Sequence, residues 1–217
     1  MNMAKNNKVS SALLDRLLLN ENRINDIIKG LKNIIKLEDP IGSEIKRWKP
    51  QNGIDISQTR VPIGVIGIIY ESRPNVTVDA SALALKSGNS IILRGGTESF
   101  YSSSALVKSI KNGLKESKIS EDCVQIVNTT NRDAVGLLLQ MNKYVNLIIP
   151  RGGKSLIERV QIDSKIPVLS HLDGLCHTYI DAEADKEMSL NIILNAKMRR
   201  TGICGATETV LCHKDVI

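Results

Sequence analysis

The stretch Val61-Pro-Ile-Gly-Val-Ile-Gly-Ile-Ile-Tyr70 decides the fold that we expect for this chain. It is apolar along its length, whereas a strand with one solvated face alternates apolar and polar side chains. Strands that are apolar on both faces belong to parallel sheets that helices cover on both sides. The run is also too short to span a membrane, and Pro62, Gly64 and Gly67 interrupt it. The stretch therefore predicts a buried strand.

Downstream of this strand, apolar strands and helices alternate, which is typical of an α/β fold. Further strands are expected at 90–93, 123–127, 145–149, 167–169, 177–180 and 209–213. Helices are expected at 79–87, 99–117, 132–141 and 185–197, and another begins at 155. The fold class is therefore a Rossmann-like parallel sheet of about five strands, with helices on both faces.

The segment upstream of the sheet predicts a helical pair. Leucines at helical spacing indicate a first helix at 12–19. Isoleucines and a leucine form the apolar stripe of a second helix at 21–37. Residues 48–58 predict a short hairpin or extended link, with Asn52-Gly53 as its turn.

Two turns between a strand and a helix share one pattern, a cation followed by two glycines. They are Arg94-Gly95-Gly96 and Arg151-Gly152-Gly153. Each lies at the carboxyl end of a parallel strand, where helix N-termini offer free amides to phosphate. Glycines required only for tight backbone turns are the alternative. We favour an anion site, although neither turn has the Gly-x-Gly-x-x-Gly pattern of ordinary dinucleotide-binding folds.

Arg73-Pro74-Asn75 forms a third loop at the same edge. Asn75 could donate a hydrogen bond to a substrate oxygen, and Arg73 could pair with a carboxylate or phosphate. Capping of the following helix by Asn75 is an equally weighted alternative.

Cys204 is the candidate nucleophile. Gly202 and Gly205 leave room for a carbonyl group to approach its sulfur, and their amides could face an oxyanion. Lys197 and Arg199-Arg200 place positive charge just upstream, which favours a thiolate. A thiolate attacks activated acyl groups. The alternative is a buried cysteine that acts as a small apolar side chain.

Composition narrows the class of protein. Of the 217 residues, 42% are hydrophobic, 24% charged and only 3% aromatic, and the net charge is +6, which is the profile of a soluble globular protein. The cations are mixed with acids, which argues against a nucleic-acid surface. The N-terminus has no apolar signal region, so we expect a cytoplasmic protein without a membrane partner. Its four cysteines fit cytosolic thiols.

Two Cys-His pairs, Cys176-His177 and Cys212-His213, do not predict a metal site. Both fall on expected strands, where neighbouring side chains point to opposite faces. The Cys-x-x-Cys spacing of zinc sites is also absent. We therefore expect no metal.

Several segments resemble the γ-glutamyl phosphate reductase family, which belongs to the aldehyde dehydrogenase superfamily. They follow one another in the family's order and cover nearly the whole chain. These segments include Tyr70-Glu-Ser-Arg-Pro-Asn75, Leu93-Arg-Gly-Gly96, Pro150-Arg-Gly-Gly153, His171-Leu-Asp-Gly-Leu-Cys-His177 and Thr201-Gly-Ile-Cys-Gly-Ala-Thr-Glu-Thr209.

The resemblance implies a reaction and a cofactor. The family reduces L-glutamyl 5-phosphate with NADPH to L-glutamate 5-semialdehyde in proline biosynthesis. Cys204 would then form a thioester that hydride transfer reduces. Both Arg-Gly-Gly turns would fall where the superfamily wraps its dinucleotide, here NADP(H).

Complete family members begin before Met1 and extend well past Ile217. We therefore expect an N-terminal helical segment and link at 1–58, a dinucleotide-binding domain at 59–197, and the start of a truncated catalytic domain at 198–217. A complementing polypeptide would carry the missing C-terminal half.

Three functions stay open at this point. The first is a reductase, working alone or completed by a partner. The second is an inactive remnant or a nucleotide-binding module without catalysis. The third is acyl transfer or hydrolysis by Cys204, for which no histidine is marked as the base.

Overall fold

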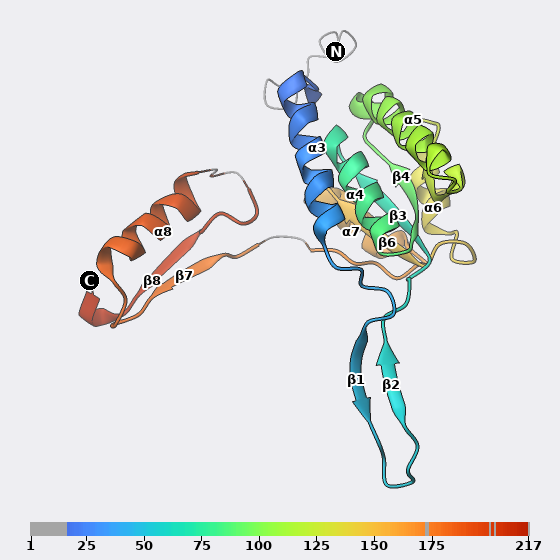
Figure 1. The fold of residues 1–217 in the computed structure, drawn as a ribbon. Helices are drawn as coiled ribbons and strands as arrows, with labels where there is room; N and C mark the ends of the chain where they lie inside the picture. Colours follow the sequence, from blue (N-terminus) through green and yellow to red (C-terminus); the bar gives the residue numbers. More distant parts are fainter. Residues whose placement is uncertain (1–16, 172–173, 200, 202, 217) are drawn as a thin grey trace. The chain divides into compact units, whose positions relative to one another are not determined.

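The computed structural model describes residues 17–171, 174–199, 201 and 203–216 of the chain. The chain divides into an N-terminal unit that ends at Ser170 and a C-terminal unit that begins at His171 (Figure 1). The functional boundaries that we expect after residues 58 and 197 stay a prediction, because this division reflects packing alone.

A four-stranded parallel sheet forms the centre of the N-terminal unit. Its strands are β3 (Val65–Tyr70), β4 (Ser90–Arg94), β5 (Val124–Ile126) and β6 (Leu147–Arg151). They lie in the order β5-β4-β3-β6, and every neighbouring pair is parallel. The stretch that decided the expected fold thus supplies a central strand, and the predicted α/β class is confirmed.

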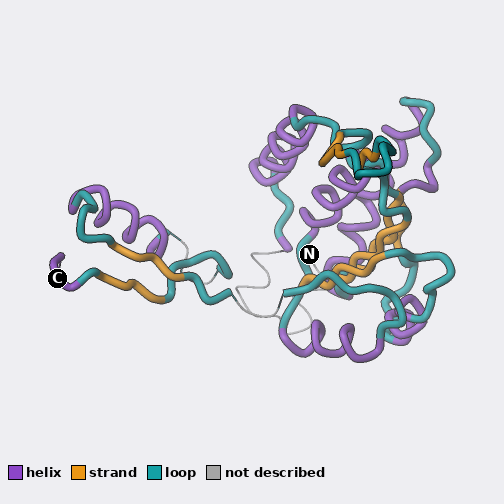
Figure 2. The backbone as a smooth tube through the Cα atoms, turned by 90° about the horizontal axis from the view of Figure 1, so that it is seen from below, coloured by secondary structure: helices purple, strands orange, loops and turns teal. Residues whose placement is uncertain are grey.

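Helices cover both faces of this sheet (Figure 2). The covering helices are α4 (Pro74–Lys86), α5 (Phe100–Glu116), α6 (Asp133–Leu139) and α7 (Lys154–Asp163). Ile69 packs into an apolar cluster with residues of α6 and α7, whereas Tyr70 packs with residues of α4 and α5. Adjacent residues of one strand face opposite sides of the sheet, which explains why β3 must be apolar on both faces.

The strand expected at 167–169 is reduced to a single parallel bridge between Ile148 and Val168. Ile148 donates its N–H to the carbonyl of Pro167 at 2.9 Å, and Leu169 donates to the carbonyl of Ile148 at 2.9 Å. Pro167 has no N–H to extend the ladder, which keeps this pairing short.

Two element boundaries differ from the prediction for local reasons. β3 begins at Val65 instead of residue 61, because Gly64 has a φ of +119° and Pro62 has no N–H. α4 begins at Pro74 instead of residue 79, because proline suits the first position of a helix.

The described N-terminal region contains one helix and a hairpin. Helix α3 (Glu21–Lys36) matches the second predicted helix, and its N-cap Asn20 accepts a hydrogen bond from the N–H of Arg23 at 3.0 Å. The helix predicted at 12–19 lies mostly outside the described residues, so the helical pair stays a prediction. The expected hairpin is present as β1 (Glu44–Trp48) and β2 (Ile56–Thr59), which pair antiparallel.

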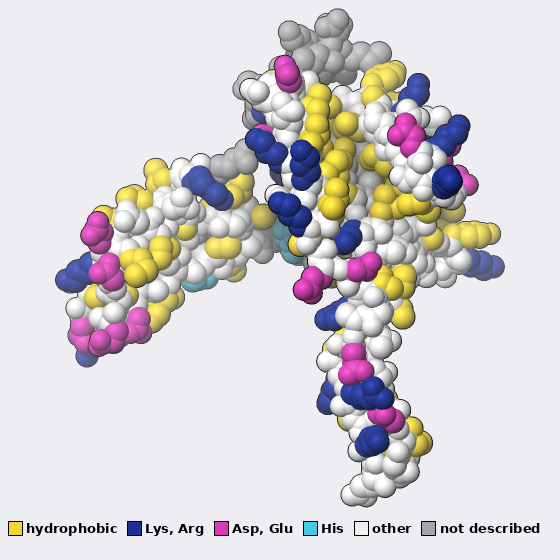
Figure 3. All heavy atoms as spheres, viewed as in Figure 1, with side chains coloured by type: hydrophobic (Ala, Val, Ile, Leu, Met, Phe, Trp, Pro, Cys, Tyr) yellow, Lys and Arg dark blue, Asp and Glu magenta, His cyan; other side chains and the backbone are white. Residues whose placement is uncertain are grey.

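Helix α3 lies beside α4 (Figure 1). Its predicted apolar stripe is only partly covered there. Ile24, Ile28 and Ile35 remain exposed, and hydrophobic side chains next to lysines and arginines are visible along α3 in Figure 3.

The C-terminal unit is a small parallel β-α-β arrangement. Strand β7 (His177–Ile180) pairs in parallel with β8 (Thr209–Cys212), and α8 (Lys186–Met198) connects them. The strand expected at 177–180 is present, and it pairs in this small sheet, apart from the four-stranded one. Its residues alternate between exposed and half-buried, which is typical of a strand with one solvated face. Short 3-10 helices complete the described structure at Thr97–Ser99, Glu121–Cys123 and Lys214–Val216.

Gly64→Ala is expected to lower the free energy of unfolding by at least about 2 kcal/mol. A Cβ at this position would lie 2.3 Å from Oδ1 of Asn146, and the backbone has a positive φ. Urea unfolding followed by circular dichroism measures the change.

Gly113→Ala in α5 is the matched control, because nothing lies within 4 Å of its Cβ position. Alanine should stabilise this helical site by roughly 0.5–1 kcal/mol. An equal effect of both substitutions would contradict the account of how β3 begins.

Candidate functional site

A cleft of about 510 Å³ lies at the carboxyl edge of the main sheet, where β3 and β4 end. Three arginines from different elements line it. Arg94 is the last residue of β4, Arg132 is the N-cap residue of α6, and Arg159 belongs to α7. The carboxylates of Glu71 and Glu98 line the same cleft. The cleft includes Arg94 and Gly96 of the first Arg-Gly-Gly turn, whereas Arg151, Gly152 and Gly153 are not among its lining residues. It is a charged hollow in which cations outnumber acids.

Arg94 supports the wall of this cleft. Its side chain is buried and donates hydrogen bonds to the carbonyl oxygens of Gly95, Thr130 and Asn131, the last two at 3.2 and 3.3 Å. Burial lowers the pKa of Arg94, and the charge of Arg132 lowers it further. Arg94 thus ties the turn after β4 to the loop after β5. Its Nε makes no hydrogen bond within the described part of the chain.

The first Arg-Gly-Gly turn requires glycine for packing. A Cβ at Gly95 would lie 3.1 Å from the ring of Tyr70, and one at Gly96 would lie 2.8 Å from Oγ of Ser72. Ser72 in turn donates to Oε2 of Glu98 at 2.7 Å. The alternative of tight backbone packing therefore has direct support here, and anion binding by these amides stays a prediction.

The second turn already holds an anion from the protein itself. The N–H of Gly153, at the start of α7, donates to Oε1 of Glu71 at 2.9 Å. A Cβ at Gly152 would lie 2.9 Å from Cδ of the same carboxylate. A negative charge is favoured at a helix N-terminus. A phosphate group at this turn would therefore compete with Glu71.

Arg73 and Asn75 are exposed, and neither lines the cleft. Arg73 is the N-cap residue of α4, so the alternative in which Asn75 caps the helix is wrong. Asn75 lies within the first turn and donates through Nδ2 to Oδ2 of Asp79 at 3.3 Å. Burial raises the pKa of Asp79, and this hydrogen bond opposes the rise. A substrate contact by Arg73 or Asn75 stays a prediction.

A buried polar network lies beneath the cleft. The hydroxyl of Tyr70 is 2.7 Å from Oγ1 of Thr77, and Thr77 donates to Oγ of Ser103 at 3.1 Å. Burial raises the pKa of Tyr70. The network joins the end of β3 to α4 and α5, so it holds one side of the cleft in place.

Cys204 lies in the C-terminal unit, on the loop between α8 and β8, and it is exposed. The alternative of a buried apolar cysteine is therefore wrong. A Cβ at the neighbouring Gly205 would meet nothing within 4 Å, so space is open beside the sulfur-bearing residue. Arg200 and Gly202, which we also expected near the nucleophile, lie outside the described residues.

The loop that carries Cys204 is anchored at Cys204 and at Thr207. The N–H of Thr207 donates to the carbonyl of Ala196 in α8 at 3.2 Å. Its Oγ1 also lies 2.9 Å from Oγ1 of Thr178 in β7. Cys176 donates through Sγ to the carbonyl of Cys204 at 3.3 Å. An exposed thiol on an anchored loop suits a nucleophile, because its position is set before a substrate binds.

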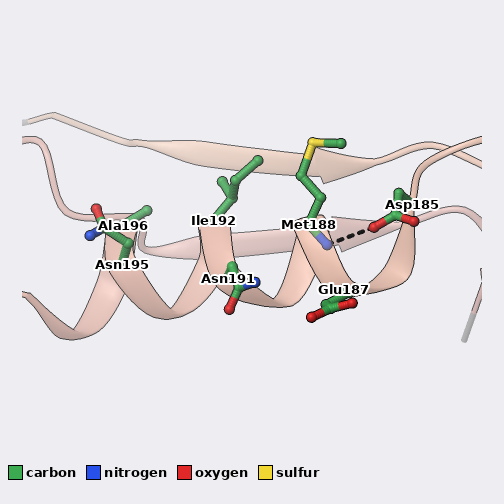
Figure 4. A pocket seen from close by; sticks show the side chains of 7 residues that line it. All are labelled: Asp185, Glu187, Met188, Asn191, Ile192, Asn195 and Ala196. Carbon is green, nitrogen blue, oxygen red and sulfur yellow. Dashed lines mark hydrogen bonds between the residues drawn. The ribbon is translucent and has the colours of Figure 1, made fainter.

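A separate hollow of about 620 Å³ follows α8 (Figure 4). Asp185 lies at one end and accepts a hydrogen bond from the N–H of Met188 at 2.7 Å as the cap of the helix. Cys204 is not among its lining residues. The hollow thus runs along one face of a capped helix, and its lining does not include the candidate nucleophile.

The described residues contain no group of three or more His, Cys, Asp or Glu side chains that could hold a metal ion. No helix in the same part of the chain is long and apolar enough to cross a membrane.

The sequence matches the aldehyde dehydrogenase family over residues 19–217, and the chain belongs to this family. Within it, the chain is 56% identical over 206 residues to the gamma-glutamyl phosphate reductase of Paramagnetospirillum magneticum, covering 95% of this chain and 49% of that protein. The reductase of Rhodospirillum rubrum is 54% identical, with 96% and 49% covered. The chain spans about half the length of the curated relatives that it matches.

Solved structures agree with these relatives. The crystal structure of gamma-glutamyl phosphate reductase from Thermotoga maritima superposes with a TM-score of 0.89 at 44% identity, covering 99% of this chain and 52% of that one. The Saccharomyces cerevisiae reductase gives 0.70 at 32% identity, with 99% and 53% covered. The resemblance stated from the sequence motifs is confirmed.

Arg94→Lys is expected to lower the free energy of unfolding by about 1–3 kcal/mol. Lysine keeps the charge but cannot reach three carbonyl oxygens with one planar group. Thermal and urea unfolding measure the loss.

Arg132→Lys serves as the control, because Arg132 is exposed at the same cleft and should change stability by less than about 0.5 kcal/mol. If Arg94→Lys were equally silent, Arg94 would not support the wall of the cleft.

Proposed function

We propose that this chain carries the cofactor-binding region and the nucleophile of a γ-glutamyl phosphate reductase. The reaction would reduce L-glutamyl 5-phosphate with NADPH to L-glutamate 5-semialdehyde. The observation that carries this proposal is the 44% identity and 0.89 TM-score to the Thermotoga maritima reductase over 99% of the chain. An exposed cysteine on an anchored loop fits the thiol chemistry of such an enzyme.

Cys204 acts as the nucleophile in this proposal. Its sulfur attacks the acyl carbon, the bond from that carbon to the phosphate oxygen breaks, and phosphate leaves as a thioester forms. A bound dinucleotide supplies the hydride that reduces the thioester. Collapse of the resulting thiohemiacetal releases the aldehyde and returns the thiol. Open space at Gly205 gives the acyl group access to the sulfur.

The charged cleft of the N-terminal unit is the proposed cofactor site. The aldehyde dehydrogenase family uses NAD(P) cofactors. Arg132 and Arg159 are exposed in the cleft, and Nε of Arg94 makes no hydrogen bond within the described residues. Guanidinium groups bind phosphate through paired hydrogen bonds. We infer NADP(H) as the cofactor, because its additional phosphate fits a cleft with more cations than carboxylates.

The second half of the relatives has a role in this proposal as well. Rate enhancement depends on holding the acyl carbon against both the sulfur and the nicotinamide. The chain spans about half the length of its relatives, so the remaining contacts belong to the part of those relatives that this chain does not cover. A cytoplasmic location belongs to the same proposal and is supported by four free cysteines.

A nucleotide-binding module without catalysis is the second candidate function. The cleft and its arginines lie within the N-terminal unit, so they form without the nucleophile loop. This function would require cofactor binding without turnover.

The isolated chain is expected to give little or no oxidation of NADPH with enzymatically generated glutamyl phosphate. Adding the C-terminal half of the Thermotoga maritima reductase should raise turnover, because it supplies the missing walls of the site. The rate of absorbance loss at the NADPH band measures turnover.

Cys204→Ser is the matched control and should abolish the restored activity. Turnover by the wild-type chain alone that the variant loses would show that no partner is needed. Cofactor binding without turnover in any mixture would favour the nucleotide-binding module.

Arg132→Ala and Arg159→Ala are each expected to weaken NADPH binding about tenfold, the cost of one lost charged phosphate contact of about 1.4 kcal/mol. NADH should be affected less, because it lacks the additional phosphate. Fluorescence titration with both cofactors measures the two affinities.

Lys108→Ala in α5 removes an exposed cation that does not line the cleft and should change neither affinity. Glu71→Gln should act in the opposite direction and tighten NADPH binding, because a competing carboxylate is lost at α7. Equal losses for NADPH and NADH in both arginine variants would contradict NADP(H) selectivity.

A further inference from the structure

Cys176 lies against Cys204 within the C-terminal unit, and the proposed reaction does not use it. Its Sγ donates a hydrogen bond to the carbonyl oxygen of Cys204 at 3.3 Å. Cys204 is exposed and Cys176 is partly buried. A reactive thiol at the surface therefore has a second, more sheltered thiol beside it.

The backbone around Cys176 holds this contact in place. The carbonyl of Cys176 accepts the N–H of Glu208 at 2.9 Å and that of Thr209 at 3.3 Å. A Cβ at Gly174 would lie 2.5 Å from the carbonyl oxygen of Cys204 and 3.7 Å from Sγ of Cys176. The segment before β7 thus runs in direct contact with the nucleophile loop.

The contact between Sγ of Cys176 and the carbonyl of Cys204 brings the sulfur of Cys204 within reach of Cys176. The sulfur of any cysteine lies only about 3–5 Å from its own carbonyl oxygen, whichever staggered rotamer it adopts. Because Sγ of Cys176 touches the carbonyl of Cys204, side-chain rotation on an exposed loop can bring the sulfurs together. A disulfide forms when the two Cα atoms lie roughly 4.4–6.8 Å apart and the sulfurs can reach bonding distance.

We propose that Cys176 is the resolving thiol of Cys204 and closes a Cys176–Cys204 disulfide when a hydroperoxide oxidises the nucleophile. This inference rests on the proposed function only in taking Cys204 as the reactive thiol. The disulfide keeps Cys204 from irreversible oxidation to sulfinic acid, and a dithiol reductant restores it.

The chemistry takes place in two balanced steps. The thiolate of Cys204 attacks one peroxide oxygen, the O–O bond breaks, and hydroxide or alkoxide leaves. Sulfur is oxidised by two electrons to a sulfenic acid, and the peroxide is reduced. Sγ of Cys176 then attacks the sulfenic sulfur, the S–O bond breaks, and the departing oxygen takes the thiol proton to leave as water.

Cys212 provides an internal control for this pairing. In the register of β7 and β8, His177 pairs with Thr209 and Ile180 with Cys212. Cys176 and Cys212 therefore lie at opposite ends of the two-stranded sheet. If thiols were oxidised at random, Cys204 would form disulfides with Cys176 and Cys212 alike. If Cys176 is the resolving thiol, Cys204 pairs with Cys176.

The test treats the folded full chain with one equivalent of hydrogen peroxide, blocks the remaining thiols and maps the products by mass spectrometry. Digestion with trypsin and a glutamate-specific protease is needed, because cleavage after Glu208 separates Cys204 from Cys212. We expect a Cys176–Cys204 linked peptide that a dithiol reductant releases, with Cys123 and Cys212 still alkylated.

Cys176→Ser should leave sulfenic acid at Cys204, which dimedone traps, and raise its sulfinic acid about fivefold over wild type. Cys212→Ser should form the same linked peptide as wild type.

The inference is overturned if wild type yields no Cys176–Cys204 peptide, or if Cys204 pairs with Cys212. The linked peptide is measured in the wild-type chain and does not depend on turnover. If it is absent while the chain has reductase activity, only the disulfide inference fails. If it forms in a chain that no partner activates, only the proposed reductase function fails.

Discussion

Burial of β3 on both faces is the constraint on which the N-terminal unit depends. Ile69 and Tyr70 enter two different apolar clusters, so both faces of the strand are covered. A strand enclosed in this way needs hydrogen-bonded neighbours on both sides, because its backbone groups have no solvent to pair with. β4 and β6 provide those neighbours, and their carboxyl ends then adjoin that of β3. The charged cleft forms beside these adjoining ends, so the site follows from how the strand is buried.

The sequence was sufficient for those parts of the fold that depend on local pattern. Continuous apolar strands and amphipathic helices carry their signal within a few residues, which is why the main sheet and its helices were predicted. The pairing of the strand at 177–180 had no local signal, because its partner follows α8 in the chain. The start of β3 was misplaced although its causes are local, because Pro62 has no N–H and Gly64 has a positive φ. Asn146, which is distant in sequence, then accepts the N–H of Val65 at 2.8 Å.

The candidate site also combines features that are local in sequence with contacts between distant residues. Cys204 could be found from its neighbours in sequence, because glycines and a basic approach are local features. Its contact with Cys176 spans 28 positions and left no local trace. Glycines at the Arg-Gly-Gly turns are ambiguous in sequence, since packing and ligand binding require the same residue. The structure shows the packing contribution, with Tyr70 and Ser72 beside the first turn and Glu71 at the second. Arg132 and Arg159 were missed, although the position of Arg132 at the start of a helix that follows a strand could have indicated it. Arg159 lies in the middle of α7 and had no such signal.

Charge compensation within the protein offsets the repulsion between the arginines of the cleft. Arg94 lies in the field of Arg132, which together with burial lowers its pKa, while Glu98 acts in the opposite direction. Glu71 adds a second negative charge and holds the amide at the start of α7. A polyanion that enters the cleft therefore replaces a charge that the protein already supplies. The binding free energy of that polyanion is the difference between its own attraction to the N-terminus of α7 and the attraction of Glu71 that it replaces. This difference is smaller than either attraction alone. The carboxylates that help to hold the walls of the cleft therefore reduce the binding energy that its three arginines would otherwise give to a polyanion.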